Sequence, residues 1–304
     1  MQMSSLINAL PGAVAQGLIW GIMAIGVFIT YKVLDLADLT VDGTMCTGGA
    51  VCCMMTIAGY PMWLSMICAF FAGTLAGLAT AILHTKLGIP AILAGILTQL
   101  SLYSINLRIL DDSANKALSV DKYDLLVSLR YINNAMLVTG VILFVLICVL
   151  YWFFGTELGA SIRSTGANPN MSRAQGVNTD LTKILGLMLS NGLVAVSSAL
   201  LTQYNGFADV NMGRGAIVIG LAAVIIGEAI FGKISENFAF KLAYVAVGAV
   251  IYYIVVQTVV SLKLMSTNDM KLLSAMIVAL FLSVPYLKNK YMPKKKTRVK
   301  GGAA

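Results

Sequence analysis

Residues 134–154 read NAMLVTGVILFVLICVLYWFF and contain no Asp, Glu, Lys or Arg. A helix that crosses the hydrocarbon layer of a bilayer needs about 20 mainly apolar residues. Inside that layer only a helix or a closed barrel satisfies every backbone polar group. This stretch therefore predicts a membrane-spanning helix.

The rest of the chain repeats this pattern. Hydrophobic residues make up 59% of the 304 residues and charged residues 11%, whereas soluble domains carry roughly 25% charged residues. Similar apolar segments lie at residues 12–30, 43–58, 61–83, 87–108, 134–154, 184–204, 214–231, 239–261 and 271–287. We therefore expect an all-α polytopic membrane protein with roughly nine to ten transmembrane or re-entrant helices.

The charges outside these segments predict an orientation. Residues 288–304 carry seven Lys and Arg and no acid, so the positive-inside rule places this tail in the cytoplasm. Counting spans back from the tail places 109–133 outside and 155–183 inside. No folded domain accompanies the tail, so we expect no nucleic-acid binding. The side on which the N-terminus lies stays open.

Two stretches indicate an internal repeat. Residues 36–50 read LADLTVDGTMCTGGA and residues 207–221 read FADVNMGRGAIVIGL. One fixed offset aligns Ala37-Asp38 with Ala208-Asp209. Interrupted helices in corresponding halves are typical of transporters, and an ionisable residue at membrane depth is costly and usually functional. The repeat therefore predicts where a solute pathway would run.

Polar residues near the predicted interruptions are the candidates for contacting a solute. They are Asp38, Thr40, Asp42, Asn191, Gln203, Asn205, Asp209 and Asn211. For each of them, a hydrogen bond between packed helices is an equal alternative. Arg214, beside the glycines of the second stretch, either lies in the pathway or shifts its selectivity.

Residues 155–180 read GTELGASIRSTGANPNMSRAQGVNTD, a loop with its own helix signals. A first short helix is expected from Glu157 to Ser164, stopped by Gly166. Asn168 is a good N-cap and Pro169 suits the first position of a second helix. Gly176 is placed to end that helix. The hairpin offers Arg163 and Arg173 to a partner.

This loop resembles the cytoplasmic loop of ATP-binding-cassette (ABC) importer permeases of the branched-chain amino acid and monosaccharide class. The residues that carry the resemblance are Gly159, Arg163, Gly166, Asn168, Pro169, Arg173, Gly176 and Asn178. The sequence Gly88-Ile89-Pro90 resembles the same class. Residues 206–228 resemble a branch often linked to aromatic amino acid uptake.

The resemblance implies a type II importer fold in a single permease domain, residues 1–304. Its parts are a first half (12–154), a coupling loop (155–183), a second half (184–287) and the basic tail (288–304). By this resemblance, residues 159–176 dock on the ATPase. The cargo would be an amino acid with an aromatic or branched side chain.

The resemblance also implies a set of partners. They are two ABC ATPase subunits that bind ATP and Mg, a second permease that is either an identical copy forming a homodimer or a close relative, an extracytoplasmic substrate-binding protein and the lipid bilayer. The location would be the bacterial cytoplasmic (inner) membrane, and this chain would bind no cofactor of its own.

Enzymatic functions find little support in the residues. Residues 227–233, GEAIFGK, approach the phosphate-binding motif, but Ile234 stands where Ser or Thr must reach magnesium. The single histidine, His84, lies at a span end, and no zinc-protease or serine-hydrolase motif occurs. We therefore expect no catalytic residue and no metal site.

Two other transport functions remain as alternatives. The first is an ABC permease for a sugar or nucleoside. The second is an ion-coupled secondary transporter, in which Asp38, Asp42, Asp209 and Glu228 would be the coupling carboxylates.

Overall fold

The computed structural model describes residues 2–120, 122–232, 235, 237–261 and the positions 272, 275, 276, 278–280 and 283, with side chains described from residue 9 onward. The helices are α1 (Gln2–Phe28), the π-helical turn η1 (Ile29–Val33), α2 (Thr40–Ile57), α3 (Met62–Thr85), α4 (Ala91–Ile109), the 3-10 turn η2 (Leu129–Tyr131), α5 (Ile132–Gly155), α6 (Glu157–Ala167), α7 (Pro169–Ala174), α8 (Thr179–Asn205), α9 (Ala216–Phe231) and α10 (Phe238–Ser261). Two short strands, β1 (Asn115–Ala117) and β2 (Phe207–Asp209), complete the set.

Eight of the predicted segments coincide with helices α1 to α5 and α8 to α10. The predicted break at Gly59 is confirmed, because α2 ends at Ile57 and Gly59 adopts a positive φ of 88° before α3 begins. The ninth segment, 271–287, and the tail 288–304 fall outside the continuously described residues. The same is true of the loop 262–270.

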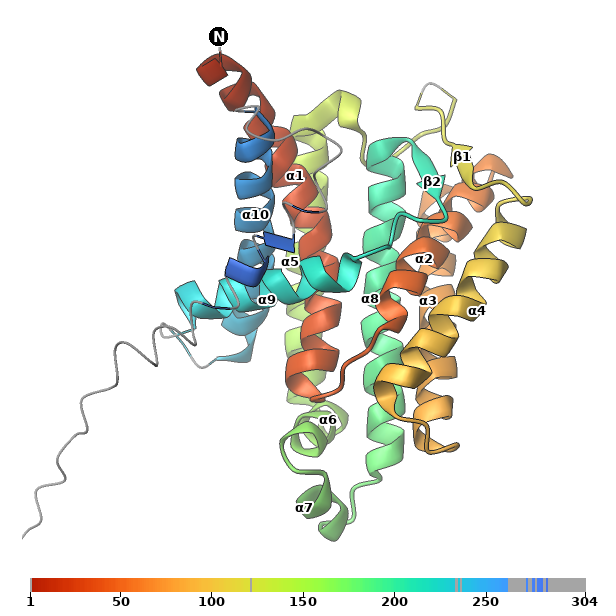
Figure 1. Ribbon diagram of the computed structural model, residues 1–304, viewed down its shortest axis with the longest axis vertical. Helices are drawn as coiled ribbons and strands as arrows, with labels where there is room; N and C mark the ends of the chain where they lie inside the picture. Colours follow the sequence, from red (N-terminus) through yellow and green to blue (C-terminus); the bar gives the residue numbers. More distant parts are fainter. Residues whose placement is uncertain are drawn as a thin grey trace, which may run out of the picture.

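Six of the described helices are long and apolar enough to cross a bilayer. They span Ala9–Val33, Met62–Thr85, Ala91–Ile109, Leu129–Gly155, Thr179–Asn205 and Phe238–Ser261. Helix α2 is inside the bundle and is rich in Gly and Thr, and α9 is short. Figure 1 shows α9 crossing at a large angle to α1 and α8.

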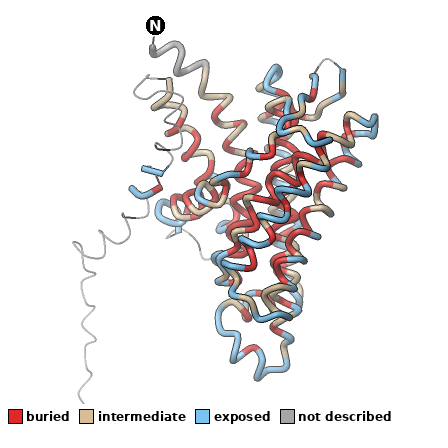
Figure 2. Tube along the Cα trace, turned by 45° about the vertical axis from the view of Figure 1, so that its right-hand side comes forward, coloured by how far each residue is buried: buried red, intermediate tan, exposed pale blue. Residues whose placement is uncertain are grey.

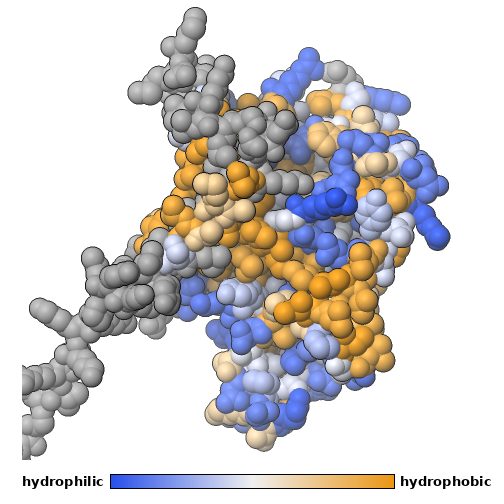
Figure 3. All heavy atoms as spheres, in the orientation of Figure 1, coloured by the Kyte–Doolittle hydropathy of each residue, from blue (hydrophilic) through white to orange (hydrophobic). Residues whose placement is uncertain are grey.

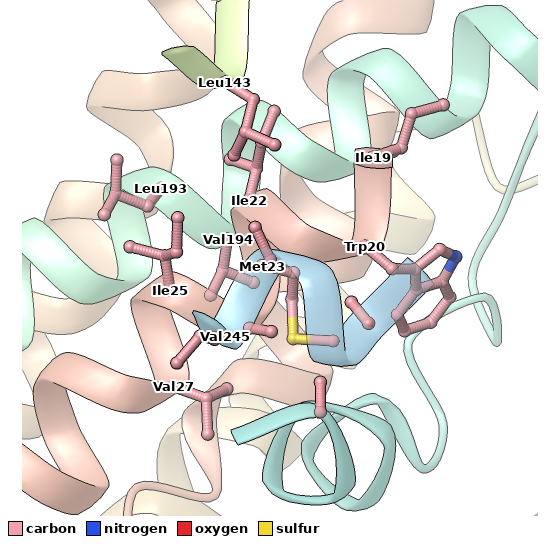
Figure 4. Packing of buried hydrophobic residues seen from close by; sticks show 14 of the residues in the cluster. Ile19, Trp20, Ile22, Met23, Ile25, Val27, Leu143, Leu193, Val194 and Val245 are labelled. Carbon is pink, nitrogen blue, oxygen red and sulfur yellow. The ribbon is translucent and has the colours of Figure 1, made fainter. Parts of the chain in front are cut away.

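Helix α1 lies at the centre of the apolar core. Its most apolar window is 78% buried, whereas the corresponding window of α5 is 22% buried. Figure 4 shows side chains of α1 packed between Leu193 of α8, Leu143 of α5 and Val245 of α10. The two halves of the chain therefore interlock around α1 instead of forming separate units.

Small residues let α3 approach α8 closely. A Cβ at Gly73 would lie 2.5 Å from the carbonyl oxygen of Asn191, which is closer than real Cβ atoms come. Helices in lipid gain little from apolar burial against each other, so close packing and hydrogen bonds stabilise their contact. Gly73 is therefore required by the α3–α8 contact.

The outward faces of α4 and α5 are apolar. Trp152 and Phe144 on α5 are 71% and 68% exposed. Exposed apolar patches of this extent mark a contact with lipid or with another protein. Figure 3 shows hydrophobic atoms over much of the middle of the molecule, whereas the lower end is mainly hydrophilic.

The two connecting regions with most polar residues lie at opposite ends of the bundle, as alternation of the spans requires. The hairpin of α6 and α7 is at one end, and β1 and β2 are at the other (Figure 1). The strands pair antiparallel, with Asn115 opposite Asp209. This small ribbon was not expected in an all-α chain; it links the region between α4 and α5 to the residues after α8.

Candidate functional site

The α6–α7 hairpin has a side-chain cap at the start of each helix. The Thr156 hydroxyl accepts a 3.4 Å hydrogen bond from the backbone N–H of Gly159, at the start of α6. The Asn168 side chain accepts a 3.0 Å bond from the N–H of Met171, at the start of α7. Gly176 follows α7 with a φ of 85°, the left-handed conformation that favours glycine. The predicted Asn168 cap and the predicted turn at Gly176 are confirmed, whereas the Thr156 cap was not predicted.

One prediction about the hairpin is wrong. Gly166 does not stop α6, which continues to Ala167. Instead, Gly166 packs so closely against Val33 and Leu34 that a Cβ would overlap the Val33 carbonyl oxygen. The glycine is therefore needed for the contact between α6 and η1. A sequence pattern cannot separate these two uses of glycine, because the partner segment is distant in the chain.

Both predicted arginines of the hairpin make contacts within the chain. Arg173 donates a 2.9 Å hydrogen bond to the Thr179 hydroxyl of α8. The Arg163 guanidinium lies 5.7 Å from the ring centroid of Phe238, at the start of α10. Both side chains remain exposed. They stabilise the hairpin's position and still present part of their charge outward.

Met171 is a candidate that the sequence analysis did not single out. It lies on α7 and is 59% exposed, among exposed polar residues. Figure 2 shows how exposure is concentrated at this end of the molecule, below a buried centre. A lone methionine inside a polar, helix-forming loop was the available signal. Methionine adapts well to an irregular partner surface.

A buried polar network joins the start of α2 to the middle of α8. The Asp38 carboxylate accepts a 2.9 Å bond from the N–H of Thr40 and a 2.7 Å bond from the Asn191 amide. The Thr44 hydroxyl donates a 2.7 Å bond to Oδ1 of the same Asn191 amide. Asn191 is fully buried and Asp38 is 3% exposed. These two predicted residues therefore lie together and hold α2 against α8.

A chain of hydroxyls extends this network towards α3 and α4. The hydroxyls of Thr40 and Thr80 lie 2.6 Å apart, and Thr80 donates a 2.9 Å bond to Thr98. All three residues are buried. The buried hydroxyls at the start of α2 are thus satisfied by other protein groups, as buried polar groups require.

Asp42 connects the two interrupted helices. One carboxylate oxygen accepts a 2.9 Å bond from the N–H of Gly215, and the other accepts a 3.0 Å bond from the N–H of Ile217. A carboxylate at a helix N-terminus satisfies free N–H groups and complements the positive end of the helix dipole. The first stretch of the repeat thereby caps the helix of the second.

The other predicted residues lie towards the β1–β2 end. Gln203 accepts a 3.2 Å bond from the N–H of Leu126, and Asn205 is the last residue of α8. Asp209, in β2, accepts a 2.5 Å bond from the N–H of Asn211. The eight candidates therefore do not form one site: some lie in the α2–α8 core, Gln203, Asn205 and Asp209 lie towards the ribbon, and Asn211 lies in the turn before α9.

The aligned aspartates of the repeat make the same local bond. Asp38 accepts from the N–H two residues later, and so does Asp209. The helices that follow differ, because α2 begins two residues after Asp38 and α9 begins seven residues after Asp209. The similarity thus extends to the turn but not to the start of the helix.

Two cavities adjoin these elements. The first, of about 850 Å³, lies at the α6–α7 end and is lined by residues that include Lys32, Arg163 and Glu228. The Lys32 ammonium and the Glu228 carboxylate are 2.9 Å apart and about half exposed. The second, of about 390 Å³, lies between α2, α4 and the turn before α9. Within the described part of the chain, no three His, Cys, Asp or Glu residues are grouped as metal ligands.

Comparisons with known proteins define the class. The chain matches the family described as "Branched-chain amino acid transport system / permease component" over residues 10–283. It is therefore a membrane permease component of an ABC importer, and it belongs to this family. As a permease subunit, it is not itself an enzyme.

Individual relatives agree with this assignment. The chain is 38% identical to the tyrosine transport system permease protein of Clostridioides difficile (strain R20291), over 92% of this chain and 91% of the relative. It is 28% identical to the galactofuranose transporter permease protein YtfT of Escherichia coli (strain K12), over 62% and 55% of the two chains.

A solved structure shares the fold. PsaBC from Streptococcus pneumoniae, in complex with Fab, aligns with a TM-score of 0.54 at 15% identity and covers 95% of this chain and 99% of the other.

Proposed function

We propose that this permease carries an amino acid, with an aromatic or branched side chain, across the bacterial cytoplasmic membrane. The relative of 38% identity is named for tyrosine transport, and the match extends over nearly the whole chain. The fold offers polar interruptions at the starts of α2 and α9, where a hydrophilic solute would replace water. The α6–α7 end is cytoplasmic in this proposal, and the β1–β2 ribbon faces outward.

The proposed coupling surface is the exposed side of α6 and α7. Met171 and Pro169 form an apolar centre with Arg173 beside them, and these residues are exposed. An apolar centre surrounded by polar groups is the usual composition of a specific protein interface. The partner in this proposal is one of two ABC ATPase subunits. The observation that carries the proposal is the capped α6–α7 hairpin in a chain that belongs to the permease family.

Movement of the hairpin would reach the pathway through short links. Gly166 lies against η1, and η1 leads directly into the segment that contains Asp38. The hydroxyls of Thr165 in α6 and Thr182 in α8 lie 2.9 Å apart. A force applied to α6 therefore acts on α8 and on the start of α2, where the proposed pathway lies.

The complete transporter in this proposal contains two copies of the chain, two ATPases and an extracytoplasmic binding protein. The decisive experiment reconstitutes these purified components in liposomes and measures uptake of radiolabelled L-tyrosine, L-phenylalanine and L-leucine. Uptake should require the binding protein outside and ATP on the side of the ATPase. Uptake that continues without ATP and stops when the proton or sodium gradient is collapsed would instead support the ion-coupled alternative.

A sugar cargo is the second candidate, because YtfT, a relative over 62% of this chain, is named for galactofuranose transport. Competition separates the two candidates. Unlabelled amino acids should reduce tyrosine uptake, whereas a panel of pentoses and hexoses should leave it unchanged.

A further inference from the structure

The cavity of about 390 Å³ between α2, α4 and the turn before α9 has a polar lining. Volumes of roughly 300–1,000 Å³ are typical of small-molecule sites. The lining residues that matter here are Asp42, Gln99, Tyr103, Asn106 and Arg214. In Figure 3, hydrophilic atoms reach into the middle of the face on which α2, α4 and α9 lie in Figure 1.

The cavity lies near the middle of the membrane span. Gln99 and Tyr103 are central positions of α4, which runs from Ala91 to Ile109. A Cβ on Gly43 would lie 3.1 Å from the Cα of Gln99, so the first turn of α2 is level with the centre of α4. Arg214 is held at this level, because the next residue, Gly215, donates its N–H to Asp42.

Arg214 forms no ion pair within 4 Å among the described residues, although Asp42 lines the same cavity. The ion pairs among them are Lys32–Glu228 and Lys116–Asp111, and no hydrogen bond of the Arg214 side chain occurs in that part of the chain. The residue is exposed. An unpaired guanidinium against lipid at this depth is expensive. The cavity must therefore open to water or to a ligand rather than to lipid.

Asn106 adds an unused acceptor. Its amide nitrogen donates a 3.4 Å bond to the carbonyl oxygen of Gly43, which fixes the orientation of the amide. Its Oδ1 is buried and has no partner among the described residues, and the residue is 1% exposed. A buried acceptor without a partner is costly. The lining thus holds a guanidinium that forms no ion pair, and one of its residues, Asn106, has a buried acceptor without a donor.

We propose that this cavity is the subsite in which the permease binds the zwitterionic end of its amino acid cargo. Arg214 binds the carboxylate through paired N–H groups, a geometry that suits guanidinium and carboxylate. Oδ1 of Asn106 accepts a hydrogen bond from the ammonium. Tyr103, which is 44% exposed, packs against the side chain of the cargo. Asp42 is a positioning residue, because its oxygens hold the turn that carries Arg214.

The test changes the charge at position 214 and rests on the proposed amino acid transport. Arg214→Cys is introduced into the complete ATP-driven complex, which is then treated with a cationic or an anionic methanethiosulfonate reagent. Loss of a charge-assisted contact should lower L-tyrosine uptake roughly ten- to hundredfold. The cationic reagent should restore part of the uptake, whereas the anionic reagent should not. Arg214→Lys should retain more uptake than Arg214→Gln.

Arg108→Cys is the matched control, because Arg108 is an exposed arginine in the last turn of α4. It should transport normally with either reagent, and the unmodified protein treated in parallel accounts for the five native cysteines. Normal uptake in Arg214→Cys overturns the proposal. So does an equal effect of both reagents, or a lack of reaction with either. If the unmodified complex imports no amino acid, the proposed function fails instead.

Discussion

The Asp42 carboxylate of α2 accepts a 3.0 Å hydrogen bond from the backbone N–H of Ile217, in the first turn of α9. These residues lie in opposite halves of the chain. A second bond from Gly215 completes the cap. A residue that follows the polar interruption in one half therefore stabilises the helix start in the other half.

Replacing Asp42 should show this dependence. Asp42→Ala removes both acceptors and should lower the free energy of unfolding by about 1–3 kcal/mol, which is the range for losing a helix cap or bonds to a charged group. Asp42→Asn keeps one acceptor and should lose less. Thermal unfolding of the purified permease measures both. Asp124→Asn, in an exposed loop position, is the control, and equal melting of all three variants would contradict the prediction.

Gly166→Ala should separate α6 from η1. The added methyl group would overlap the Val33 carbonyl, so α6 must shift away. We expect uptake to fall at least tenfold while the permease still inserts in the membrane and binds the ATPase. Gly155→Ala is the matched control, because no atom lies within 4 Å of its added Cβ. Unchanged uptake in Gly166→Ala would show that the α6–η1 contact plays no part in coupling.

Met171 should contribute to ATPase binding. Full burial of a methionine side chain contributes about 1.5–3 kcal/mol, so Met171→Ala should weaken association with the ATPase roughly tenfold or more. Met171→Asp should weaken it further. Affinity of the detergent-solubilised permease for its ATPase measures this. Leu129→Asp, at the other end and 54% exposed, should bind normally; unchanged binding of both Met171 variants would remove α7 from the interface.

The orientation is open to a direct measurement. Single cysteines at Gln175 in the hairpin and at Lys122 near the ribbon are reacted with a membrane-impermeant maleimide, in a background without native cysteines. In cells whose cytoplasmic membrane is intact and whose outer layers let the reagent through, the cysteine at 122 should react and the one at 175 should not. After the cytoplasmic membrane is opened, both should react. The reverse pattern would place α6–α7 outside and end the coupling proposal.

The sequence was sufficient to predict the apolar helices and both ends of α7 in the hairpin. Apolar segments of about 20 residues have one stable form in lipid, which is why 134–154 and α5 agree. The Asn168 cap and the turn at Gly176 depend only on neighbouring residues. The family resemblance of the loop is likewise confirmed by the match over residues 10–283.

Long-range contacts were beyond the sequence pattern. Gly166 looked like a helix stop, because nothing local indicated that η1 lies against it. The predicted pathway residues are divided between the α2–α8 core and the ribbon end, because similar polar residues serve helix packing in both places. Their roles in binding a solute stay predictions, as does the docking role of the hairpin.

The β1–β2 ribbon limits how this chain can move. It fastens the region after α4 to the region after α8 at one end of the bundle, while Gly166 fixes α6 to η1 at the other. An opening of one half away from the other would break the β1–β2 pairing and separate α1 from α8 and α10. A chain that is fastened in this way moves as one rigid body. We therefore expect the gate to form at the interface between two copies of the permease.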